Sequence, residues 1–182
     1  MNLLLKISKV FIPAFLKKRE LMYLFDITAE AFACAAPNLN GQSFNDSLAM
    51  YAQFTRTAAE QSIMRGDSQR IIQERLFQGA FQLGEKYKRR FQIKTINEAM
   101  EAGRILYHIL GIEFNGDSEG VITIRSCFFS KYYSALTCSM VSSLDAGLMA
   151  GLSGGSTLKF FRRITEGHDY CSAQLLAKEY SK

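Results

Sequence analysis

The pattern of apolar residues changes near residue 120, from a spacing typical of helices to one typical of a strand. Before this point the sequence predicts a helix over about residues 14–35, a second after Ser43 and a third after Ser68. Thr95-Ile96-Asn97-Glu98 has the T-x-x-E form of a capping box, which predicts the start of a fourth helix. Beyond it, Val121-Ile122-Thr123-Ile124 is rich in β-branched residues and predicts a strand.

The last third of the chain predicts one more helix and a hairpin. Residues 128–150 have helical character and end before a glycine-rich segment. Residues 157–165 and 170–176 predict two strands, joined by the turn Glu166-Gly167-His168-Asp169.

Helices followed by a small antiparallel sheet and a crossing helix are typical of the α+β class. A sheet of about three short strands needs a helical layer over one face, so we expect residues 1–182 to form a single domain. In this domain residues 1–112 form the helical layer, which packs on the sheet. Residues 120–177 form a strand-helix-hairpin unit that carries the candidate site.

The net charge and composition limit the classes of partner. The formal charge is +5, and basic residues gather over residues 6–19 and 86–94. No ribonucleoprotein, zinc-finger or helix-turn-helix signature accompanies them, so we expect no nucleic-acid partner. No uncharged apolar run approaches the roughly 20 residues of a membrane span, and no signal-peptide pattern is present. We therefore expect no transmembrane segment, a cytoplasmic location and free thiols at the four cysteines.

The first 19 residues are both apolar and basic. Apolar residues recur at helical spacing between lysines, which predicts a short leader helix before Pro13. These residues are Leu3, Leu4, Ile7, Val10 and Phe11. Because this helix is too apolar to be left in water, we expect a homodimer through the N-terminal helices. Contact of residues 1–19 with the surface of a membrane is the alternative.

The residues that could carry chemistry lie between Cys127 and Cys171. Cys138 and Asp145 are seven residues apart, so they share one face of the predicted helix. Cys171 begins the last predicted strand, just after the turn that contains His168. If the hairpin packs beside the helix, these four side chains meet in one site.

Such a site has two possible chemistries and one structural explanation. An activated thiolate at Cys138 or Cys171 is a nucleophile, with Asp145 or His168 moving protons. Alternatively, Cys138 and Cys171 with a His or Asp are reasonable zinc ligands, which makes zinc the candidate cofactor. The structural explanation is that free cysteines pack as small hydrophobic residues.

Arginines on the predicted strands could bind an acidic ligand. Arg162 and Arg163 are adjacent, so one of them should point toward the covered face of the sheet. A buried arginine needs an anion, either Asp145 or the acid group of a ligand. Arg125 has the same potential on the first strand.

Three segments of the C-terminal third follow a recognisable order. Cys127–Tyr133 is a C-x-F-type segment, Asp145–Leu152 belongs to a helix with an aspartate, and Arg163–Cys171 has a G-x-x-x-C ending. In this order the chain resembles the L-2-amino-thiazoline-4-carboxylic acid hydrolase family. Ser142 stands where that family has its helix cysteine, and Cys138 lies one turn earlier on the same face.

This resemblance implies a small hydrolase that opens a cyclic C–N bond of a carboxylate-bearing small molecule. Cys138 or Cys171 would then be the nucleophile or a metal ligand, and Asp145 the acid or base. Arg163 or Arg125 would hold the carboxylate of the substrate, with His168 as a further substrate contact.

The G-x-x-x-C ending is also similar to the 4-vinyl reductase domain, a ligand-binding module in which some members bind zinc through cysteines. Cys138 and Cys171 match two such cysteines, whereas Phe160 and Arg163 stand where a further acidic residue and cysteine are expected. This second resemblance implies a non-catalytic sensor of an apolar or tetrapyrrole-like ligand. It predicts a large apolar cavity lined by residues such as Phe77, Phe81, Phe128 and Phe160.

Overall fold

The computed structural model describes residues 13–176, so the predicted leader helix over residues 3–12 lies outside the described residues. Helices and strands follow in an order that confirms the α+β class. The helices are α2 (Ala14–Ala31), α3 (Phe44–Arg65), α4 (Gln69–Phe91), α5 (Ile96–Ile109) and α6 (Ala135–Ser153), with short 3₁₀ helices η1 (Phe128–Lys131) and η2 (Ile164–Glu166). The strands are β1 (Ile112–Gly116), β2 (Val121–Cys127), β3 (Thr157–Arg162) and β4 (Cys171–Leu176).

The predicted helix starts are confirmed by their caps. The Ser43 side chain accepts a hydrogen bond from the Asp46 backbone N–H at the start of α3. Thr95 and Glu98 form both halves of the predicted capping box before α5. Gly111 ends that helix with a positive φ of 68°, a left-handed conformation that glycine adopts without a steric penalty.

Two predicted boundaries were wrong. The helix expected from residue 128 begins only at Ala135, where the Ser134 side chain accepts from the Thr137 backbone N–H. The strand expected over 157–165 ends at Arg162, because the chain turns into η2 at Ile164.

The sheet contains four antiparallel strands in the order β1-β2-β4-β3, one more than expected. The additional strand is β1, whose residues Ile112 and Phe114 are buried and alternate with exposed polar residues. Phe160 pairs with Ala173 and Arg162 with Ser172, so β3 has one extra residue in between. A bulge of this kind bends the strand and redirects the side chains that follow it.

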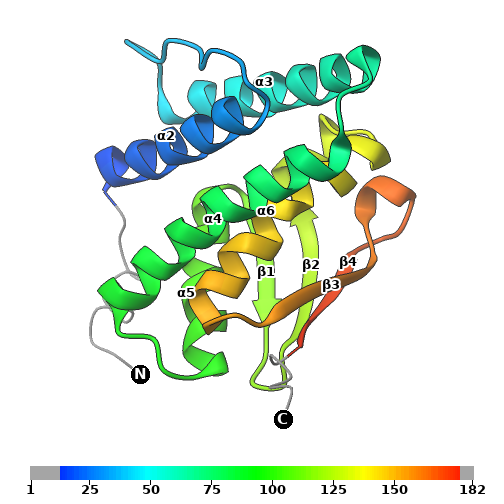
Figure 1. Cartoon of the computed structure of the whole chain (residues 1–182). Helices are drawn as coiled ribbons and strands as arrows, with labels where there is room; N and C mark the ends of the chain where they lie inside the picture. The colour runs from blue at the N-terminus through cyan, green and yellow to red at the C-terminus, as the bar shows by residue number, and fades with distance from the viewer. Residues whose placement is uncertain (1–12, 177–182) are drawn as a thin grey trace.

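Helix α6 lies in the middle of the fold (Figure 1), where α4 packs along it and α2 and α3 lie over this pair. Glycines allow the backbones of α4 and α6 to approach closely: a Cβ at Gly147 would lie 3.0 Å from Ala80 Cβ, and one at Gly151 would lie 2.7 Å from Glu85 N. In the described part of the chain, α6 is the one helix long and apolar enough to span a membrane. Helix α6 packs against α4, α5 and β3, and a helix in the core of a fold has this apolar composition.

Candidate functional site

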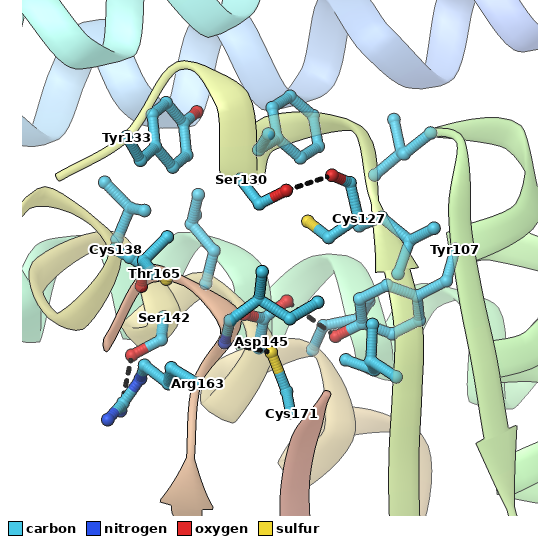
Figure 2. A pocket seen from close by; sticks show the side chains of 18 of the residues that line it. Tyr107, Cys127, Ser130, Tyr133, Cys138, Ser142, Asp145, Arg163, Thr165 and Cys171 are labelled. Carbon is cyan, nitrogen blue, oxygen red and sulfur yellow. Dashed lines mark hydrogen bonds between the residues drawn. The ribbon is translucent and has the colours of Figure 1, made fainter. Parts of the chain in front are cut away.

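A cavity of about 110 Å³ lies between α6 and the sheet. Most of the side chains that line it are apolar, and they come from the helices, from the strands and from the segment after β3. Its polar side chains are Tyr51, Tyr107, Cys127, Ser130, Tyr133, Cys138, Ser142, Asp145, Arg163, Thr165 and Cys171. Figure 2 shows most of these side chains around one space, with Asp145 near its centre.

Asp145 is the acidic residue of the cavity. The Tyr107 hydroxyl on α5 donates a hydrogen bond to Asp145 Oδ1 on α6, with an O···O distance of 2.7 Å. Burial raises the pKa of Asp145 from 3.8 to about 6, although the Tyr107 hydrogen bond and the Arg163 charge both lower it. Burial and the Asp145 charge also raise the pKa of Tyr107 well above its usual value, so the phenol remains a donor. At neutral pH Asp145 is therefore mostly ionised and gains a proton readily.

Arg163 is the basic residue that lines the cavity, and it follows the bulge in β3. Its neighbour Arg162 does not line the cavity and donates a hydrogen bond to the Tyr170 hydroxyl. The Arg163 side chain is only 18% exposed. Its guanidinium forms an ion pair with Glu166 at 3.2 Å and donates to Ser142 Oγ at 3.3 Å. Its Nε is buried and has no hydrogen-bond partner among the described residues. The ion pair of Arg163 is therefore with Glu166, and the buried Nε–H donor is not used by either contact.

Three of the four cysteines line the cavity: Cys127 at the end of β2, Cys138 on α6 and Cys171 at the start of β4. Burial raises the pKa of each thiol, that of Cys127 to about 12. Smaller effects lower the pKa values: Thr165 and Arg163 act on Cys138, and the Ile164 backbone N–H donates to Cys171 Sγ at 3.3 Å. The three thiols are consequently protonated at neutral pH, and none is a preformed thiolate nucleophile.

The structure brings together Cys138, Asp145, Arg163 and Cys171, as expected from the sequence, but not two other predicted site residues. Arg125 on β2 and His168 in the loop before β4 are exposed and do not line the cavity. Arg125 lies at a strand position that faces away from the core. His168 follows η2, where the chain turns outward after Gly167.

The predicted zinc site is not supported by the arrangement of donors. In the described residues, no group of three His, Cys, Asp or Glu side chains is placed to hold a metal ion. Cys138 and Cys171 both line the cavity, but no third ligand joins them, and Asp145 accepts its hydrogen bond from Tyr107. We therefore derive no chemistry through a metal.

Tyr107 and Ser142 are the site residues that sequence reasoning did not select for a role. Tyr107 is buried, and a buried tyrosine hydroxyl usually has a hydrogen-bond partner. A tyrosine on the apolar face of a helix therefore indicates that a polar residue lies next to its hydroxyl. That partner is 38 residues away, so only the packing of α5 on α6 identifies it. Of the four phenylalanines expected to line a large cavity, only Phe160 does so.

Comparisons of the chain with protein-family models, with curated proteins and with solved structures found no match.

Proposed function

We propose that the cavity between α6 and the sheet binds a small molecule of about one ring. The observation that carries this proposal is a mainly apolar cavity whose lining includes one acid, Asp145, and one base, Arg163. A volume of about 110 Å³ is below the ~300–1,000 Å³ of pockets for drug-sized ligands. It is close to that of an engineered cavity of about 150 Å³ that accepts benzene. This size favours a one-ring ligand over a tetrapyrrole.

The charges of the site suggest that the ligand is a zwitterion. The buried Nε–H of Arg163 has no partner among the described residues and could donate to a carboxylate. Tyr107 bonds to Oδ1 of Asp145, which leaves Oδ2 to accept from a protonated nitrogen. The two residues are close enough for Arg163 to lower the pKa of Asp145, but they form no ion pair with each other. A ligand with a protonated nitrogen and a carboxylate would satisfy both residues, while its apolar body fills the rest of the cavity.

Three probes with the same five-membered ring test this proposal: cyclopentanecarboxylate, cyclopentylamine and cycloleucine, which has both charged groups. We expect cycloleucine to bind most tightly in calorimetric titrations. Arg163→Gln should weaken the two probes with a carboxylate by about 10- to 100-fold, and Asp145→Asn the two with an amine by a similar factor. Equal binding of all three probes, or of wild type and variants, would contradict the zwitterion proposal.

A second candidate function is hydrolysis of a cyclic C–N bond, and the pKa of Asp145 favours it. A carboxylate with a pKa of about 6 is mostly ionised at neutral pH and still basic enough to accept a proton from water. Water would add to the ring C=N bond: its oxygen bonds to the carbon while Asp145 takes one proton and passes it to the ring nitrogen. The hydroxyl proton would then pass through Asp145 to the same nitrogen as the C–N bond breaks, which leaves an amine and a carbonyl. The cysteines, being protonated, would shape the cavity instead of attacking the substrate.

The hydrolase proposal is tested with L-2-amino-thiazoline-4-carboxylate as substrate. We expect turnover that rises with pH through about 6 and is lost in Asp145→Asn, whereas Cys138→Ser keeps most of it. Loss of turnover in Cys138→Ser with retention in Asp145→Asn would point to a thiol nucleophile. No turnover with intact binding would leave the protein a binding module.

A further inference from the structure

Three aliphatic hydroxyls line the cavity, and two of them already donate their hydrogen within the protein. Ser130 Oγ donates to the Cys127 carbonyl oxygen at 2.8 Å. Ser142 Oγ donates to the Ser139 carbonyl oxygen, also at 2.8 Å. The third is Thr165 on η2, whose Oγ1 is buried and has no hydrogen-bond partner among the described residues. A buried hydroxyl without a partner costs free energy, so an acceptor on a ligand would stabilise it.

Thr165 and Arg163 lie along the same side of α6, and Figure 2 shows both with Ser142 on one side of the cavity. Arg163 donates to Ser142 Oγ. Burial raises the pKa of the Cys138 thiol, and the Thr165 hydroxyl next to it partly offsets this effect. Because Cys138 and Ser142 are four residues apart on α6, the two contacts are one helical turn apart, about 5.4 Å. A protonated thiol is a weak acceptor, so the Thr165 hydroxyl is free to turn toward a stronger one.

Three contacts hold the guanidinium of Arg163 in place. Its Nη1 pairs with Glu166 at 3.2 Å, and its Nη2 donates to Ser142 Oγ at 3.3 Å. Its Cζ lies over the Phe160 ring, 4.7 Å from the ring centre, which fixes the plane of the group. None of these contacts uses the buried Nε–H. Among the described residues, this Nε–H and the Thr165 hydroxyl are therefore two donors of the cavity wall without an acceptor.

We propose that the Arg163 Nε–H and the Thr165 hydroxyl together bind one carboxylate of the ligand. This inference rests on the proposed binding function of the cavity, and it adds Thr165 as a residue that determines specificity. A carboxylate has two oxygens that accept hydrogen bonds, so one accepts from Arg163 while the other accepts from Thr165. Both bonds are charge-assisted, and a ligand without a carboxylate leaves both donors unpaired.

Calorimetric titration of the full-length chain with the three cyclopentane probes tests the role of Thr165. Thr165→Val replaces the hydroxyl with a methyl group of similar size. We expect it to weaken cyclopentanecarboxylate and cycloleucine by about 10-fold and to leave cyclopentylamine unchanged. Thr165→Ser keeps the hydroxyl and should bind all three probes as the wild type does. Thr157→Val, at an exposed position of β3 that does not line the cavity, is the matched control and should change no affinity.

The stability of the free protein gives a readout that does not depend on a probe. Because the Thr165 hydroxyl has no partner among the described residues, Thr165→Val should not lower the free energy of unfolding in urea. A clear loss of stability, absent in Thr157→Val, would show that the hydroxyl is already bonded within the protein and would contradict the proposal.

The double variant Arg163→Gln/Thr165→Val shows whether the two residues share one carboxylate. If they do, its loss of affinity for cyclopentanecarboxylate should be smaller than the product of the two single losses. Losses that multiply, or an equal loss for cyclopentylamine in Thr165→Val, would overturn the inference. If Arg163→Gln weakens cyclopentanecarboxylate and Thr165→Val does not, the role of Thr165 is wrong and the binding function stands. No binding of any probe to the wild type would refute the binding function itself.

Discussion

Replacing Asp145 with asparagine should change how the stability of the protein depends on pH. The carboxyl group has a pKa of about 6 in the folded chain and 3.8 without the effects of burial. Between these values the unfolded chain has released the proton while the folded chain still holds it. Because the folded state binds more protons in this window, the free energy of unfolding of the wild type falls as pH rises from about 4 to about 6.

The expected size of this effect follows from the shift in pKa. A difference of about two pKa units, at about 1.36 kcal/mol each, corresponds to about 3 kcal/mol. The asparagine side chain cannot ionise, so the Asp145→Asn variant lacks this contribution and should gain about 3 kcal/mol relative to the wild type between about pH 4 and pH 7. A weaker hydrogen bond from Tyr107, or an asparagine amide without a partner at this position, would shift the free energy of unfolding of the variant by an amount that does not change with pH.

Urea unfolding at a series of pH values measures this difference directly. Other acidic groups contribute equally to both proteins, so the difference between the two curves isolates Asp145. Asp26→Asn, which removes an exposed carboxylate on α2, is the matched control for the loss of one charge. Curves that run parallel would refute the reasoning. A difference that grows in favour of the wild type would show an Asp145 carboxylate stabilised by Arg163 rather than destabilised by burial.

Two further predictions concern the surroundings of Asp145. Tyr107→Phe removes the hydrogen bond that lowers the pKa of Asp145, so the midpoint of the Asp145 titration, followed by NMR, should move to higher pH. The free energy of unfolding should fall by about 1–3 kcal/mol. An unchanged titration midpoint would contradict the role of this hydrogen bond. Gly147→Ala should destabilise the protein by about 1–3 kcal/mol in urea unfolding, because its Cβ meets Ala80 and the α4 backbone. Ser143→Ala on the same helix is the control, and equal losses in both would contradict the close packing of α4 on α6.

Local signals predicted the helices well because a helix is decided by residues close in sequence. Thr95 and Glu98 satisfy each other's backbone donors within one turn, so the pattern alone located the start of α5. Strand β1 was missed because Ile112–Gly116 is short and contains Asn115 and Gly116, which are poor strand residues. Its pairing with β2 and the burial of Phe114 under α5 determine that strand, and both are tertiary contacts.

The candidate site was partly predictable for the same reason. The spacing of Cys138 and Asp145 along one helix placed both on the face that lines the cavity. The choice between Arg162 and Arg163 depended on the bulge in β3, which no local pattern announces. Whether a cysteine is a thiolate or a protonated thiol depends on burial by residues far away in sequence, so the sequence could not decide between a nucleophilic and a packed cysteine.

The central claim, that the cavity accepts a small ligand, is tested most directly by protection of its thiols from alkylation. Mass spectrometry would follow the rate of modification at each cysteine with and without the three cyclopentane probes. Cys34 is exposed and lies away from the cavity, so it is an internal control. We predict that the best-binding probe slows alkylation of Cys127, Cys138 and Cys171 and leaves Cys34 unchanged. Equal rates with and without every probe, or equal slowing at Cys34, would contradict a ligand site in this cavity.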